Sequence, residues 1–197
     1  MIKRGFAGIS YGLIGYVLGL LTTFVLVVGR VQQLLGQTGV DSRSLAARAS
    51  ETPEVWQLIV WVFYSEHFMS IKVDSTSALG AAATRTLDQN AFSLYDFSFW
   101  NPALFLIPAV TILFVSFIFS YRTSDLNLKL VGVNGILITV GYALLGVVGA
   151  LLSTYTTIGV RVHPDYAGLP ILAVIALVVS LVGGGIAIPL SNSDSAN

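Results

Sequence analysis

The sequence predicts an all-α integral membrane protein, a four-helix bundle with an additional interfacial amphipathic helix in the connector between the first and second spans. Composition supports this class, because 55% of the 197 residues are hydrophobic, 10% are charged and the mean hydropathy is +0.82. Four uncharged stretches of about twenty residues are each long enough, as helices, to cross a hydrocarbon core of about 30 Å. They lack strand-like alternation, which argues against a membrane β-barrel.

The four spans form a single membrane domain, residues 1–197. Lys3 and Arg4 precede the first span, but this span is too long for a signal peptide and lacks a small-residue cleavage site, so we expect it to be retained. The spans are predicted at residues 6–29, 102–121, 130–153 and 169–190.

Small residues mark one face of the first span, where five glycines follow one another at intervals of three and four residues. In water each helical glycine costs about 1 kcal/mol relative to alanine. A stripe of them therefore indicates a face where helix backbones approach closely in the membrane. Small residues recur in the third and fourth spans. The predicted helix-packing residues are Gly5, Gly8, Gly12, Gly15, Gly19, Gly132, Gly135, Gly146, Gly149, Ala173, Ala176, Ser180 and Gly183.

The connector, residues 30–101, contains a second apolar stretch that is short for a span. It is apolar for about ten residues and then meets Glu66 and His67. We predict a helix at residues 53–68 that lies in the membrane interface, and a fifth, short or re-entrant span is the alternative.

Aromatic residues support the interfacial prediction, since tryptophan and tyrosine gather at the headgroup level. We expect the polar tips of Trp61 and Tyr64 to be free. The residues predicted at the interface are Trp56, Trp61, Phe63, Tyr64 and Trp100.

Basic residues near the span ends predict the orientation. Lys3, Arg4, Arg122 and Lys129 fall on one side of a four-span protein, whereas the loop between the third and fourth spans has only Arg161. The rule that basic residues stay inside then places both termini in the cytoplasm of a cell-membrane protein and the connector outside. A fifth span would reverse one end.

Several kinds of chemistry are disfavoured by what the chain lacks. It has no cysteine, which removes thiolate chemistry and cysteine metal sites, and its net charge of zero indicates no nucleic-acid surface. The predicted spans carry no Asp, Glu, Lys, Arg or His, which argues against ion-coupled transport. Among their polar residues, Asn134 is expected to bond a neighbouring helix. The sequence predicts no catalytic residue, no cofactor and no metal site.

The two histidines each have a carboxylate nearby, Glu66 beside His67 and Asp165 two residues after His163. Adjacent residues on a helix point in different directions, so the first pair is a poor ligand pair. His163, Pro164 and Asp165 together resemble a turn in the outer loop. We expect structural or solvated roles for both histidines and no metal site that joins them.

Two segments carry a resemblance to a known kind of protein. GFAGISYGLIGYVLGLLTTFVLV and, later, VWQLIVWVFYSEHFM are similar to segments of an uncharacterised family of small multi-pass membrane proteins from haloarchaea. The order of spans is similar too. The resemblance implies an archaeal cell membrane and supplies no catalytic residues.

Together these features predict a non-enzymatic accessory, assembly or interaction subunit that uses its Gly/Ala-rich packing faces. Its expected partners are the lipid bilayer and another membrane protein or a second copy of itself, with no nucleic acid. The alternative is a small channel or facilitator for an uncharged solute, which would pass between the small-residue faces of the third and fourth spans.

Overall fold

The computed structural model describes residues 2–37, 53–76, 82–87, 102–123, 126–157 and 160–194. Four of its helical segments are long and apolar enough to cross a membrane, and a fifth helix lies in the connector, which confirms the predicted fold class. The helices among the described residues are α1 (Ile2–Gln37), α3 (Val55–Ser65), α4 (Leu106–Tyr121), α5 (Leu128–Leu152) and α6 (Leu169–Asp194), with 3-10 turns η2 (Pro102–Phe105) and η3 (Tyr166–Gly168) before α4 and α6.

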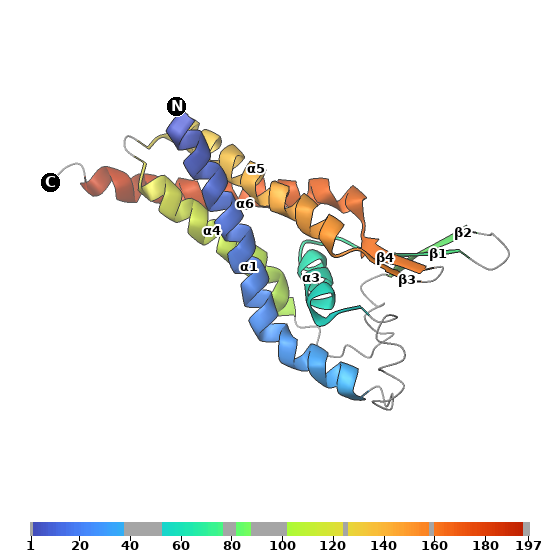
Figure 1. The fold of residues 1–197 in the computed structure, drawn as a ribbon. Coiled ribbons are helices and arrows are strands. Elements are labelled where there is room, and N and C mark those ends of the chain that lie inside the picture. Colours follow the sequence, from blue (N-terminus) through green and yellow to red (C-terminus); the bar gives the residue numbers. More distant parts are fainter. Residues whose placement is uncertain are drawn as a thin grey trace.

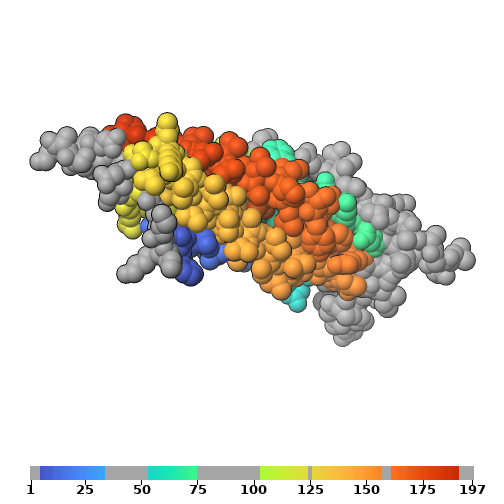
Figure 2. All heavy atoms as spheres, turned by 90° about the horizontal axis from the view of Figure 1, so that it is seen from above, coloured from blue at the N-terminus to red at the C-terminus, as the bar shows by residue number. Residues whose placement is uncertain are grey.

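The four long helices form a bundle in which each helix packs against two neighbours. Both α1 and α6 contact α4 and α5, while α4 and α5 touch each other much less. α1 begins and α6 ends at the same end of the bundle (Figure 1). α5 and α6 lie side by side along the length of the molecule (Figure 2). This arrangement is the one expected for an even number of crossings.

The fifth helix, α3, occupies the angle that opens where α1 diverges from α5 (Figure 1). Its 11 residues cover about 16 Å at about 1.5 Å per residue, which is too short to span a bilayer. It starts at Glu54, whose backbone N–H donates to Oε1 of Gln57 at 2.9 Å. It ends in a turn at Phe68, whose φ of 59° is in the left-handed region and redirects the chain toward a strand.

A four-stranded antiparallel sheet joins the connector to the loop between α5 and α6. Its strands are β1 (Ile71–Thr76), β2 (Ala82–Leu87), β3 (Tyr155–Thr157) and β4 (Val160–Pro164), in the order β2-β1-β4-β3. Val73 pairs with Val162 across the central strands. The sheet lies at the end of the bundle opposite the start of α1 (Figure 1).

The structure differs from the sequence prediction in the connector and in the loop between α5 and α6. His163 and Pro164 belong to strand β4 rather than to a turn, and no strand was predicted in the connector. Pairing between segments nearly ninety residues apart holds these strands together, so local sequence carries little trace of them. Helix α1 extends past the predicted end of the first span to Gln37.

Candidate functional site

A group of buried, hydrogen-bonded polar side chains lies where α3 meets α1 and α5. We call it the α3 cluster. Its members are Tyr16 and Thr23 of α1, Tyr64, Glu66 and His67 at the end of α3, and Tyr142 of α5.

Hydrogen bonds to the backbone of α5 and of the loop after it fix the orientation of α3. Trp61 Nε1 donates to the carbonyl oxygen of Ser153 at 3.0 Å, and the Tyr64 hydroxyl donates to the carbonyl oxygen of Gly146. Both side chains are buried, so the expectation that their polar tips are free is wrong. The polar tips instead satisfy carbonyl groups of the bundle, and a buried carbonyl left without a partner is costly.

The other predicted interfacial residues differ in their surroundings. Phe63 is fully buried and packs edge-on against the ring of Tyr16, with 5.1 Å between centroids. Trp56, at the start of α3, is 41% exposed. Trp100 lies outside the described residues.

His67 is fully buried and bonded through both ring nitrogens. Nδ1 lies 2.7 Å from the carbonyl oxygen of Phe63, which only accepts, so Nδ1 carries a proton. Burial lowers the pKa of His67 to about 4. The ring is therefore neutral at pH 7, and its Nε2 accepts from the hydroxyl of Tyr142 at 2.7 Å.

Glu66 is 2% exposed and faces α1. The Thr23 hydroxyl oxygen lies 3.0 Å from Oε1 and 2.9 Å from Oε2. Burial raises the pKa of Glu66 to about 8, and the hydrogen bond from Thr23 opposes this only in part. In the described part of the chain, no Lys or Arg forms an ion pair with this carboxyl.

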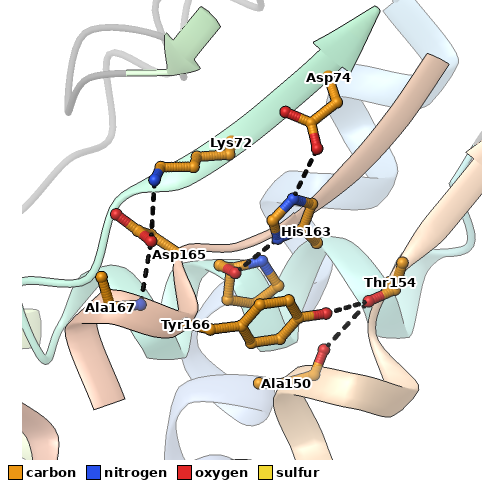
Figure 3. Close-up of polar contacts among 9 residues, drawn as sticks. Lys72, Asp74, Ala150, Thr154, His163, Asp165, Tyr166 and Ala167 are labelled. Atoms are coloured by element: carbon orange, nitrogen blue, oxygen red, sulfur yellow. Dashed lines mark hydrogen bonds and ion pairs between the residues drawn. The ribbon is translucent and has the colours of Figure 1, made fainter. Parts of the chain in front are cut away.

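A second polar group joins β1 to β4 and to the start of α6 (Figure 3). Lys72 Nζ lies 3.0 Å from Oδ1 of Asp165, and His163 Nε2 lies 3.1 Å from Oδ2 of Asp74. The His163 ring stacks on Tyr166 at 4.9 Å between centroids.

Asp165 also caps the 3-10 turn before α6, where its Oδ1 accepts from the backbone N–H of Ala167 at 3.0 Å. Slight burial raises its pKa, but the hydrogen bonds from Lys72 and Ala167 and the nearby positive charge outweigh this and lower it overall. These contacts fasten the sheet to the bundle.

Most of the predicted glycine positions of α1 face other helices. A Cβ added at Gly12 would overlap the carbonyl oxygen of Ile138 in α5, and one at Gly8 would lie 2.6 Å from Leu137 Cβ. Gly15 faces Val115 of α4, and Gly19 faces Phe63 of α3. Gly5 has nothing within 4 Å of an added Cβ.

The small residues of α5 and α6 are divided among several neighbours. Gly135 and Gly146 lie under Leu181 and Leu172 of α6, whereas Gly149 faces the hydroxyls of Tyr16 and Tyr64. An added Cβ at Gly132 would meet nothing within 4 Å. In α6, Gly183 faces Ser116 and Leu113 of α4; Ala176 and Ser180 are buried, and Ala173 is partly exposed.

Comparison with known proteins identifies a family whose function is unknown. The model of a family of unknown function, DUF7978, matches residues 4–191. The chain belongs to this family. No curated protein matches the chain, and no solved structure does. Membership in DUF7978 therefore covers nearly the whole chain and leaves its function to be argued from the structure.

The α3 cluster brings together residues that sequence reasoning left apart. The first span carries no carboxylate, yet Glu66 is placed against it by α3. A signal for this was present, because Thr23 follows Gly19 by four residues and so continues the small-residue face of α1. Tyr142 has no comparable signal. Gly141, whose added Cβ would overlap the carbonyl oxygen of Ile9, was also missed.

The described residues hold no group of three or more His, Asp or Glu side chains that could bind a metal. Asn134 Nδ2 donates to Ser120 Oγ at 3.3 Å in α4, which confirms the expected bond to a neighbouring helix. The chemistry that the α3 cluster offers is proton binding at Glu66, surrounded by neutral hydrogen-bonding groups.

Proposed function

We propose that this protein is a non-enzymatic, multi-pass membrane protein that acts as an accessory or assembly subunit, with its sheet as the recognition surface. One observation carries the proposal. Two loops nearly ninety residues apart in sequence are built into one four-stranded sheet at a single end of the bundle. An ordered platform of this kind presents fixed backbone groups to a partner.

The edges of the sheet support this role. Among the strands that the structure describes, β2 and β3 are the outer ones, and each has one side without a described neighbouring strand. Unpaired backbone groups at a sheet edge accept an added strand from another chain. The platform is braced from within by the Lys72–Asp165 pair and by the backbone bond from Asp165 N–H to the carbonyl oxygen of Ser70 at 2.8 Å.

We also propose an orientation and a location for the protein in the membrane. Arg122 follows α4 and Lys129 lies in the first turn of α5. The end of α4 and the start of α5 lie away from the sheet, near the start of α1 and the end of α6 (Figure 1). Basic residues at that end favour a cytoplasmic location for both termini and an outer location for the sheet. The resemblance to haloarchaeal proteins supports an archaeal cell membrane.

The partner is another membrane protein or a second copy of this chain. Most of the predicted glycine positions already face helices of the same chain, so the packing faces are largely used internally. Gly5, Gly29, Gly132 and Gly185 have no atom within 4 Å of an added Cβ and remain open to a neighbour. A solute path between α5 and α6 gains no support, because leucine side chains of α6 cover Gly135 and Gly146.

Cross-linking in the native membrane tests the proposal. The chain has no native cysteine, so a Thr156→Cys variant places one thiol on the exposed edge strand β3. Lys129→Cys, exposed at the opposite end, is the matched control. We expect a thiol-to-amine cross-linker to give a discrete adduct with Thr156→Cys alone, and mass spectrometry then identifies the partner. A protein that stays free of adducts at Thr156→Cys would contradict the proposal.

A further inference from the structure

The carboxyl of Glu66 is the one buried acid of the α3 cluster, and it has no role in the proposed recognition surface. It lies where the end of α3 meets α1, with Thr23 as its hydrogen-bond partner. A buried carboxylate without a cation is very costly. Buried ionisable side chains with shifted pKa values cluster at functional sites.

The Thr23 hydroxyl is within hydrogen-bond distance of both carboxyl oxygens. A hydroxyl has one proton to donate, so an ionised carboxylate would have to share that proton between its two oxygens. A protonated carboxyl uses the same geometry fully, because one oxygen accepts from Thr23 and the other donates its own proton back to Thr23 Oγ1. The geometry therefore fits the protonated acid better.

Among the described residues, no group printed near Glu66 supplies a compensating positive charge. On its own element, Tyr64 is bonded to Gly146, and neutral His67 is bonded to Phe63 and Tyr142. From the other elements, α5 places the hydroxyl of Tyr142 near Glu66, and the Tyr16 hydroxyl of α1 is bonded to that of Tyr64. Arg30 is the charged residue among the described side chains of α1; it lies two turns beyond Thr23 and is exposed.

We propose that Glu66 is a proton-binding site that controls the seating of α3 on the bundle. The bound proton keeps the carboxyl neutral while α3 is docked on α1. When the O–H bond breaks and the proton passes to water, the resulting carboxylate needs hydration, and the C-terminal end of α3 leaves its place against α1 to obtain it. The direction of the pKa change at Glu66 agrees with this, with a value of about 8 that lies close to neutral pH.

Infrared spectroscopy of the purified protein in lipid vesicles tests the protonation directly. A protonated carboxyl has a C=O stretching band that its carboxylate lacks. We expect such a band at neutral pH, lost with a midpoint near 8 and absent in Glu66→Gln. Glu54→Gln, at the exposed start of the same helix, should retain it. Glu66→Asp provides a second way to assign the band to residue 66, because this variant should shift the frequency of the band instead of removing it.

Thiol accessibility tests the movement of α3. Ser65 is buried beside Glu66, so a Ser65→Cys variant reports on opening of that end of the helix. Its reaction rate with a water-soluble maleimide is compared with that of Ser65→Cys/Glu66→Gln at the same pH, which cancels the ionisation of the thiol. We expect equal rates at about pH 6 and a rate about tenfold higher with Glu66 present at about pH 9.5, where the acid is ionised.

Three results would overturn the proposal. The first is loss of the carboxyl band near the ordinary pKa of glutamate, about 4.3. The second is equal maleimide rates in the two variants at both pH values. The third is loss of the band at neutral pH when sodium chloride replaces choline chloride, because the site would then bind a metal cation.

Discussion

At the scale of single residues, hydrogen bonds of fully buried side chains matter most, because water cannot replace a lost partner. The bond from the Tyr142 hydroxyl to His67 Nε2 at 2.7 Å joins α5 to the end of α3, and both residues are inaccessible to solvent. Its removal leaves a buried acceptor unpaired, which typically costs about 1–3 kcal/mol.

We therefore expect Tyr142→Phe to lower the free energy of unfolding by about 1–3 kcal/mol, measured by denaturation in mild detergent. Tyr11→Phe is the matched control, since the Tyr11 hydroxyl bonds Arg122 at 3.3 Å in an exposed setting. Its cost should be within about 0.5 kcal/mol of zero. Equal losses for the two variants would show that the His67 contact contributes no more than a surface bond.

The two ionisable residues of the α3 cluster predict a pH profile of stability. Folding raises the pKa of Glu66 from 4.5 to about 8 and lowers that of His67 from 6.5 to about 4, in each case through burial. Above pH 6.5, Glu66 is the one residue of this pair that binds more protons in the folded state than in the unfolded state. Stability therefore falls as the pH rises toward 8. Between 4.5 and 6.5 the two effects oppose each other and the profile is flat.

Unfolding measured across this range should show a plateau on the acid side and a decline above about 6.5, with a limiting slope of about 1.4 kcal/mol per pH unit. Glu66→Gln should abolish the alkaline decline, and its stability should instead rise with pH up to about 6.5 because His67 alone remains. An unchanged alkaline decline in Glu66→Gln would assign it to other groups.

At the scale of elements, close backbone contact joins α1 to α5. Gly12 lies against the carbonyl oxygen of Ile138, and Gly141 lies against that of Ile9, so each helix contributes one bare position to the crossing. Contact between backbones at this range is possible only without side chains. The spacing of glycines in α1 predicted such a face but could not name the helix that covers it.

We expect Gly12→Ala to destabilise the bundle by about 1–3 kcal/mol, because the added methyl group forces α1 and α5 apart. Gly5→Ala is the matched control on the same helix, since open space surrounds an added Cβ there. It should be neutral or slightly stabilising. Thermal denaturation of both variants in one detergent measures the difference, and a Gly12→Ala protein as stable as Gly5→Ala would show that α1 and α5 adjust freely.

At the scale of the whole molecule, the four spans and the sheet give the protein two distinct ends. With an even number of crossings, α1 begins and α6 ends at one end, and the sheet lies at the other (Figure 1). α3 adds no crossing because it is too short. The orientation of the protein then depends on which end of the bundle faces the cytoplasm.

We expect a membrane-impermeant maleimide added to intact cells to label Thr156→Cys on the sheet and to miss Lys129→Cys until the membrane is opened. A cysteine in the C-terminal segment, residues 191–197, should behave like Lys129→Cys. Labelling of Lys129→Cys in intact cells, with Thr156→Cys protected, would reverse the proposed orientation.

The sequence by itself determined the membrane class, the four spans and the existence of a helix near residues 53–68. These features follow from the length and polarity of each stretch. Both are local properties, and the thickness of the hydrocarbon core sets the length and polarity that a span needs. The sequence also predicted the glycine face of α1, since helical periodicity places Gly8, Gly12, Gly15 and Gly19 on one side.

Only the tertiary structure decided which elements contact one another and through which residues. It placed Glu66 against Thr23 and His67 against Tyr142, 43 and 75 residues apart in sequence, and it paired the connector with a distant loop to form the sheet. The physical reason is that a buried hydrogen bond or a strand pair depends on a partner that local sequence does not name. The burial of Glu66, and with it the proposed proton site, exists only because α3 folds back between α1 and α5.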